Sequence, residues 1–505
     1  MFRWKVTTAA LAAAALALAG CAASETPPSE SRELVLGQII SLTTFDTRQA
    51  EWGNRALYYQ AVFDTLLRGT AEGELEPYLA SEFSYNDDNT VLTLTIRDDV
   101  TFSDGTELTA DVVQANLERF RDGGGGFASD LANVASIDAP DGSTVVLTLS
   151  APDPALLSYL SREAGLMASP ASFDAEDVDT NPVGSGPYVL DTAATVTGTS
   201  YVYTKNEDYW NPDVQHYDKV TLSVLSDPTA AVNAIKAGEV DAARLADNNN
   251  NAEIEASGFT IEPNELDFQG LLLLDRGGEM DPALGDVKVR QAINYAIDRE
   301  GLLEAIQQGN GTVTTQVFRA NSAAYDPALD EAYPYDPDKA KALLAEAGHG
   351  DGLTISMPST VVLGATSFTL IQQQLAEVGI TVEYTDTAPE NYIGDLIAPK
   401  YPSVFMSLEQ NPDWQLIQFM ISRAASFNPF GYGDETSDQL ISEIQYADEA
   451  AQGEKAAELN AYLVEQAWFA PFYRVTSGYA VNGETDVTIM STNAVPAIYD
   501  IRPAS

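Results

Sequence analysis

Residues 209–242 read YWNPDVQHYDKVTLSVLSDPTAAVNAIKAGEVDA and contain one strand and one helix with sharp limits. Thr221–Leu225 is a short apolar run of the kind that forms a buried strand. Asp227 is placed to cap the first helical amides, and Pro228 at the first helical position loses no hydrogen bond. Gly238 accepts the left-handed conformation that ends a helix. The segment therefore predicts a strand followed directly by a helix, which is the repeating unit of α/β proteins.

The same alternation of strands and helices continues along the chain. Val91–Arg97 (VLTLTIR) alternates apolar and polar residues, as a half-buried strand does. Thr109 is expected to cap a helix, and Asp336 with Gly348 repeats the start and stop of the helix described above. A third helix is predicted over 286–306, where apolar residues recur at helical spacing. Further short buried strands are predicted at 271–274 and 380–384. This order predicts an α/β or α+β architecture.

The N-terminus has the layout of a secretory signal. Two basic residues precede an apolar run over 9–19, which is shorter than the ~20 residues of a membrane-spanning helix. The run ends in Leu-Ala-Gly and Cys21, a pattern that resembles the lipobox of bacterial lipoproteins. The resemblance implies a signal peptide over 1–20, a lipid on Cys21, and a polar tether over 21–32. The alternative is an ordinary signal peptide with an incidental cysteine.

Composition and missing motifs exclude several classes of function. The formal net charge of −49 argues against binding nucleic acid, and against binding anionic lipid headgroups through the protein surface. Cys21 is the only cysteine, so no disulfide is expected. The two histidines, His216 and His349, are far apart, and no metalloprotease, nucleophile-elbow, phosphate-loop or dinucleotide motif occurs. We therefore expect no enzyme activity, no metal and no cofactor, with a surface hydrolase that uses two carboxylates as a remote alternative.

A series of further motifs carries a family resemblance. They occur in order at 75–83 (LEPYLASEF), 96–113 (IRDDVTFSDGTELTADVV), 182–188 (PVGSGPY), 209–242, 286–299 (DVKVRQAINYAIDR), 336–348 (DPDKAKALLAEAG), 373–384 (QQLAEVGITVEY) and 428–447. Together they resemble the extracytoplasmic solute-binding proteins of ABC importers called family 5, the oligopeptide, dipeptide and nickel binders. Ser185 stands where threonine is more usual in that family. Gly184, Gly186 and Arg290 are interpreted as fold markers: the glycines for backbone angles that a side chain forbids, and Arg290 as a buried partner of an ion pair.

The resemblance implies an α/β, bilobal periplasmic-binding-protein-like fold of type II (cluster C), with a ligand cleft between two lobes. Lobe I is expected to combine 33–44, 183–266 and 478–505, with an extra subdomain over 45–182, and lobe II is expected to span 267–477. The hinge is expected at 264–270 and 474–480. Closing of the two lobes traps the ligand and excludes water.

The resemblance also implies a function. The expected protein is a monomer, anchored by Cys21 to the outer face of the bacterial cytoplasmic membrane. It would capture di- or oligopeptides and deliver them to an ABC permease and ATPase complex. Oligosaccharides or another organic solute remain an alternative, and a nickel chelate is a weaker one, because His216 and His349 fall inside fold motifs.

The ligand contacts are expected around 407–418 (SLEQNPDWQLIQ). Family members that bind peptides hold the α-ammonium with an aspartate about three residues before an acidic-Pro pair. With Asp413 in the acidic place, Trp414 replaces the proline and Gln410 falls at the ammonium position, beside Glu409. An amide cannot compensate a buried ammonium as a carboxylate does. Either Glu409 or Asp413 therefore compensates the ammonium group of the ligand in place of Gln410, or the ligand has no amine at this position.

Aromatic and hydroxyl side chains complete the expected site. Trp414 is either an aromatic wall for the ligand or a core residue that anchors a helix. The remaining candidate ligand-binding residues are Thr43, Thr44, Phe45, Trp52, Asn428 and Phe430.

Overall fold

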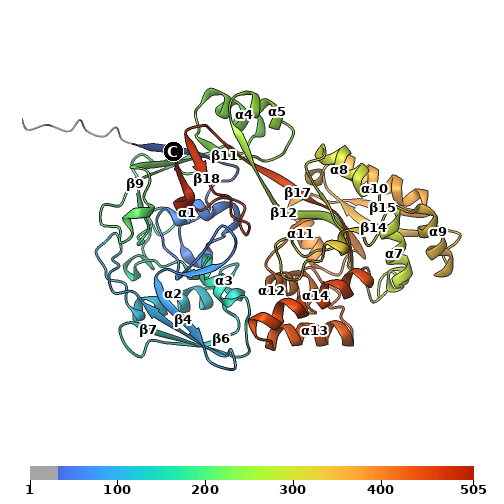
Figure 1. The fold of residues 1–505 in the computed structure, drawn as a ribbon, viewed down its shortest axis with the longest axis horizontal. Coiled ribbons are helices and arrows are strands. Elements are labelled where there is room, and N and C mark those ends of the chain that lie inside the picture. Colours follow the sequence, from blue (N-terminus) through green and yellow to red (C-terminus); the bar gives the residue numbers. More distant parts are fainter. Residues whose placement is uncertain (1–31, 505) are drawn as a thin grey trace, which may run out of the picture.

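The computed structural model describes residues 32–504 and shows a mixed α/β protein (Figure 1). The predicted signal peptide and Cys21 lie outside the described residues. Within 32–504, no helix combines the length and the apolar composition needed to cross a membrane.

A nine-stranded sheet joins segments from the start, middle and end of the chain. Its order is β16-β12-β17-β11-β1-β10-β9-β8, and β13 pairs with β17. The strands are β1 (Glu33–Gln38), β8 (Tyr188–Leu190), β9 (Ser200–Lys205), β10 (Lys219–Val224), β11 (Ala242–Arg244), β12 (Thr260–Leu273), β13 (Gly311–Val313), β16 (Ser403–Glu409) and β17 (Phe469–Val481). β1 runs parallel to β10 on one side and to β11 on the other. A helix connects β10 to β11, which is the crossover that parallel strands require.

The predicted strand–helix unit is confirmed. β10 is followed by α4 (Pro228–Ala237), in which the Asp227 side chain accepts a hydrogen bond from the Ala230 N–H at 2.8 Å. Gly238 ends the helix with a φ of 67°. Thr109 caps α2 (Ala110–Asp122), and Asp336 caps α9 (Pro337–Glu346), both as predicted.

The single helix predicted over 286–306 is wrong, because the structure has two. α7 (Val287–Ala296) ends before Ile297, and α8 (Arg299–Gln307) begins after Asp298. The side chain of Asp298 accepts a hydrogen bond from the Gly301 N–H at 3.0 Å. This local bond starts a new helix and overrides the continuous apolar pattern.

A four-stranded antiparallel sheet forms the lower left part of Figure 1. Its order is β4-β5-β7-β6, with β4 (Ala80–Tyr85), β5 (Val91–Ile96), β6 (Val134–Asp138) and β7 (Thr144–Leu149). Beside it lie α3 (Leu156–Leu160) and the hairpin of β2 (Leu67–Gly69) and β3 (Leu75–Pro77). Helix α1 (Ala56–Gln60) belongs instead to the core cluster of β1, β9 and β10. Buried residues of β5, β7 and α2 belong to one core cluster.

A second group of elements lies on the right in Figure 1. The parallel pair β14 (Leu353–Ser359) and β15 (Ile380–Asp386) shares a core with α7, α8, α9 and α10 (Ala365–Glu377). The lower helices of this group are α12 (Asp413–Leu416), α13 (Glu435–Tyr446) and α14 (Glu449–Glu465), and α11 (Pro389–Ile397) lies above them in Figure 1. The shorter elements of the chain are α5 (Asn251–Ala256), α6 (Pro282–Gly285), β18 (Thr485–Val487) and β19 (Ile501–Pro503).

The long strands β12 and β17 connect the left and right groups (Figure 1). They are antiparallel partners, and both expected hinge stretches, 264–270 and 474–480, lie within them. The pairing shifts register between Glu265 and Asp267 and again between Gln269 and Gly270. Such bulges bend a strand locally, so the backbone is least regular in the segment where a hinge was expected.

The three predicted fold markers have different physical reasons from those expected. Gly184 and Gly186 are not among the glycines with positive φ. A Cβ on Gly184 would instead lie 1.9 Å from the Val62 carbonyl oxygen, so a close approach of two backbones requires the glycine. Arg290 is buried as predicted, but its guanidinium donates to the carbonyl oxygens of Leu284 and Gln466 and forms no ion pair among the described residues.

Candidate functional site

The left and right groups of elements enclose a cleft made of two adjoining cavities. The first, called here the Trp52 cavity, has a volume of about 200 Å³. Its left side includes Trp52, Arg162 and Tyr499, and its right side includes Arg319 and Pro412. Together, the two cavities fall within the ~300–1,000 Å³ that is usual for small-ligand sites.

The second cavity, called here the Arg474 cavity, has a volume of about 300 Å³ and lies against the long strands. Glu265 of β12 and Arg474 of β17 line it, and Arg474 pairs with Asp330 at 2.9 Å. Arg319 lines both cavities and therefore marks where they meet.

Arg319 has few partners in the protein. Its Nε atom is buried without a hydrogen-bond partner, and no carboxylate oxygen of the described residues lies within 4.0 Å of its side-chain nitrogens. Burial lowers the pKa of Arg319, and the charge of Arg162 lowers it further, while Asp413 and Glu409 oppose both effects. Arg319 therefore lines both cavities with a guanidinium whose Nε has no hydrogen-bond partner in the described part of the chain.

Two acids lie side by side at the end of the sheet. Asp267 of β12 is paired directly with Glu409 of β16, so both side chains are on one face. Burial raises the pKa of Asp267 to about 6, the charge of Glu409 raises it, and Arg244 partly opposes the shift. Arg244 acts on both carboxylates but carries one positive charge against their two negative charges. A second positive charge would therefore be stabilised here.

The residues at the expected ammonium position are only partly available. Gln410 is buried, its Nε2 donates to the Val317 carbonyl oxygen at 2.9 Å, and its Oε1 is buried without a partner. Asp413 accepts a hydrogen bond from the Ser322 hydroxyl, and burial raises the pKa of this carboxyl. Glu409 and Asp413 both act electrostatically on Arg319, but neither of them lines the Trp52 cavity or the Arg474 cavity.

Trp414 lies in the core and lines neither cavity. It is 7% exposed and belongs to an apolar cluster that includes Leu156 of α3 and Met420. Nearby, the Tyr159 hydroxyl donates to Gln418 Oε1 at 3.1 Å, so α3 and the segment after α12 are in contact. Of the two readings of Trp414, the structure favours the core residue, here at a contact between the left and right groups.

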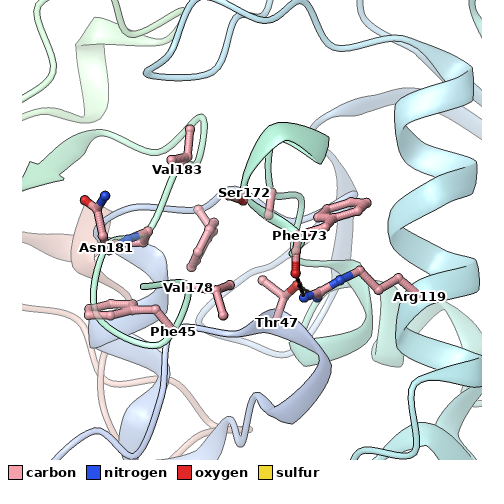
Figure 2. A pocket seen from close by; sticks show the side chains of 11 residues that line it. Phe45, Thr47, Arg119, Ser172, Phe173, Val178, Asn181 and Val183 are labelled. Carbon is pink, nitrogen blue, oxygen red and sulfur yellow. Dashed lines mark hydrogen bonds between the residues drawn. The ribbon is translucent and has the colours of Figure 1, made fainter. Parts of the chain in front are cut away.

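Most of the predicted ligand-binding residues near the start of the chain contact other parts of the protein and do not line the cleft. Phe45 and Thr47 line a separate cavity of about 10 Å³, together with Arg119, which donates to the Phe173 carbonyl oxygen at 2.9 Å (Figure 2). That volume holds about one water molecule and no solute. Thr44 is hydrogen-bonded to Asp179. Thr43 is exposed and its role stays a prediction.

Asn428 and Phe430 also have structural contacts. The Oδ1 of Asn428 accepts from Arg276 at 2.7 Å, and its Nδ2 donates to the Ser422 and Tyr432 carbonyl oxygens. Its hydrogen-bonding groups are occupied, so we no longer expect it to contact ligand. Phe430 packs against the main apolar cluster and lines neither cavity.

Among the described residues, Trp52 is thus the only predicted site residue that lines either of the two cleft cavities. Sequence reasoning missed Arg162, Arg319 and Tyr499, which line the Trp52 cavity and belong to no motif. It also missed Asp267, which lines neither cavity but is paired with Glu409. One signal in the sequence could have pointed to the arginines. The chain has 26 basic residues and 75 acidic residues, so arginines that gather in one place are unusual. Among residues 32–504, no group of three or more His, Cys, Asp or Glu side chains is placed to hold a metal ion.

Comparison with known proteins identifies the family of the chain. The family described as bacterial extracellular solute-binding proteins, family 5 Middle, matches residues 74–430. The chain is 30% identical over 396 residues to the glutathione-binding protein GsiB of Escherichia coli O1:K1 / APEC, covering 74% of this chain and 72% of that protein.

Solved structures show the same fold. The Helicobacter pylori periplasmic binding protein DppA in complex with the peptide STSA has a TM-score of 0.78 at 20% identity, covering 94% of this chain and 99% of that one. AgaA of A. tumefacien R10 in complex with agropinic acid has a TM-score of 0.76 at 25% identity, with the same coverage. The resemblance found in the sequence motifs is therefore confirmed, and the chain belongs to the family 5 bacterial extracellular solute-binding proteins.

Proposed function

We propose that this protein is the extracytoplasmic solute-binding component of an ABC importer and that it captures short peptides without chemical change. Three features support the proposal: the family, the cleft between two groups of elements, and the peptide-related ligands of its relatives. GsiB is named for binding glutathione, and the DppA structure contains a peptide. The AgaA structure contains agropinic acid, so the family fold also accepts non-peptide ligands.

We further propose the two-lobe division with boundaries 33–44, 183–266 and 478–505 for lobe I, 45–182 for its subdomain, and 267–477 for lobe II. The register shifts of β12 support a hinge at the crossing strands. Closure about this hinge would bring the two sides of the Trp52 cavity onto the ligand.

The pair of Asp267 and Glu409 is the observation that favours a ligand with an ammonium group. The two carboxylates are neighbours across β12 and β16, and Asp267 has a raised pKa that a bound cation would lower. This pair would compensate the ligand's ammonium charge in place of the aspartate whose position Gln410 occupies. A neutral oligosaccharide has no charge for the two carboxylates to compensate.

Replacing Glu409 by glutamine should therefore weaken the binding of a pool of free dipeptides by about 1.5–3 kcal/mol, the usual contribution of a hydrogen bond to a charged group. Isothermal titration calorimetry measures this loss. Glu383→Gln, an exposed change on β15, removes the same charge away from the cleft and should leave affinity unchanged.

Equal affinities of wild-type protein and Glu409→Gln would count against the ammonium site. Mass spectrometry of solutes released from the denatured wild-type protein gives an independent test. Recovery of neutral sugars alone would replace the peptide proposal by the oligosaccharide alternative.

We also propose that Cys21 carries the lipid anchor at the outer face of the cytoplasmic membrane. Cys21→Ala should then release the protein from the membrane fraction, because one lipidated residue carries the whole attachment. Fractionation followed by immunoblotting measures the release. Retention of the variant on membranes after a carbonate wash would contradict the anchor.

A further inference from the structure

The segment 489–493 lies between the two cavities of the cleft. Met490 and Thr492 line the Trp52 cavity, whereas Ile489 and Ser491 line the Arg474 cavity, so successive side chains face different cavities. We propose that this segment is a partition that divides the cleft into an apolar and a polar compartment, and that the protein therefore selects solutes with one apolar arm and one neutral polar arm. The inference rests on the proposed function and specifies the class of dipeptide.

Contacts with distant parts of the chain hold the partition in place. The segment belongs to no helix or strand. Carbonyl oxygens of the segment and of the residue after it accept hydrogen bonds from the side chains of Asn264 at 2.9 and 3.3 Å, Arg162 at 2.5 Å and Arg244 at 2.7 Å. The Ser491 N–H donates to the Ala71 carbonyl oxygen at 2.8 Å. These bonds satisfy backbone groups that have no strand partner, and they fix the wall that a selective site requires.

Aromatic and thioether side chains make the Trp52 cavity the apolar compartment. Trp52, Met490 and Tyr499 are buried and line this cavity. Leu75 and Pro412 extend the apolar lining. Burial of apolar surface against such side chains is favourable, whereas an amide buried there without a hydrogen-bond partner is costly. The Trp52 cavity therefore favours an aliphatic or aromatic arm of the ligand.

Amide groups make the Arg474 cavity the polar compartment. Asn264 and Asn321 line it, and within the described part of the chain no aromatic side chain does. The charge of Arg474 is already compensated, because its side chain lies 2.9 Å from an Asp330 oxygen and 3.5 Å from a Glu265 oxygen. An amide both donates and accepts hydrogen bonds. The two amides therefore favour a neutral arm that can do the same, such as another amide or a hydroxyl group.

The volumes limit each compartment to one part of a ligand. The Trp52 cavity of about 200 Å³ and the Arg474 cavity of about 300 Å³ lie at or below the lower end of the ~300–1,000 Å³ that is usual for a complete small-ligand site. Arg319 lines both cavities and marks the place where a ligand can pass from one to the other. A solute with two short arms joined at this place fills both compartments, and a dipeptide has this form.

The test measures the affinities of four dipeptides at neutral pH by isothermal titration calorimetry: Leu-Gln, Gln-Leu, Leu-Leu and Gln-Gln. We expect the better of the two mixed dipeptides to bind about 10- to 100-fold more tightly than either uniform one. Leu-Leu leaves the amides of the polar compartment without partners, and Gln-Gln buries an amide against apolar side chains. Both mixed orders are measured, because either end of the dipeptide can enter the polar compartment.

Two variants should change this preference in opposite directions. Asn321→Leu removes an amide from the polar compartment and should reduce the advantage of the mixed dipeptide over Leu-Leu by about 10-fold. Met490→Gln brings an amide into the apolar compartment and should reduce the advantage over Gln-Gln by about 10-fold. Asn391→Leu, at an exposed position of α11 that lines neither cavity, is the matched control. Each advantage is a ratio of two affinities for one protein sample, so a partly unfolded variant still gives a valid result.

The possible results separate this inference from the peptide proposal. A mixed preference that the two variants change as stated supports both. Equal affinities for mixed and uniform dipeptides, or a preference that neither variant changes, overturn the partition and leave the peptide proposal standing. Hexyl glucoside, glucose and hexanol serve as non-peptide probes with both arms or one arm. If no dipeptide binds and hexyl glucoside binds more tightly than glucose and hexanol, the partition stands and the peptide proposal falls. Failure of all these compounds to bind overturns both.

Discussion

Replacing Arg299 by methionine should lower the free energy of unfolding by about 3–5 kcal/mol, because several buried carbonyl acceptors would lose their donor at about 1–3 kcal/mol each. Arg299 is 6% exposed and donates hydrogen bonds to the carbonyl oxygens of Thr314, Pro471, Asn294 and Tyr333, at 2.8–3.2 Å. Methionine fills much of the volume but donates nothing. Several buried carbonyl groups would then lose their partners, and each such loss is costly.

This effect should be read from chemical denaturation, as a lower midpoint at an unchanged slope. Arg502→Met is the control, because the side chain of Arg502 is 57% exposed. Arg299 connects α8 to β17, the strand that crosses between the two groups of elements. A loss below about 1 kcal/mol would show that water replaces these hydrogen bonds, contrary to the burial of the site.

Replacing Trp414 by alanine should also cost about 3–5 kcal/mol of stability, as is usual when a buried tryptophan is truncated. Trp414 is 7% exposed within an apolar cluster, and it lines neither cavity of the cleft. We therefore expect the affinity for free dipeptides to change little. Denaturation and calorimetry on the same variant measure the two effects separately.

Tyr446→Ala provides the comparison, since Tyr446 is 63% exposed and its truncation should leave stability nearly unchanged. If Trp414→Ala lost affinity and kept its stability, the side chain would contact the ligand, as the other reading of the sequence held. A large loss of stability with unchanged affinity would establish the core role.

The sequence alone determined those parts of the protein that depend on short-range interactions. The helix limits set by Asp227 and Gly238 were predicted correctly, because a cap is a hydrogen bond between neighbours in the chain. The order of motifs also sufficed to identify the family, since each motif reports a local turn, cap or amphipathic face. The break between α7 and α8 was missed, although Asp298 is itself a local signal that the apolar pattern concealed.

The tertiary structure decided which side chains meet at the cleft. Arg162 and Arg319 are 157 residues apart in the chain, yet they line one cavity. Asp267 and Glu409 are neighbours only because β12 pairs with β16 in one register. Trp414 could be read from the sequence as core or as ligand wall, because both environments are apolar. Only long-range strand pairing and packing fix burial, local charge and the partners of each group, and these properties distinguish a binding residue from a structural one.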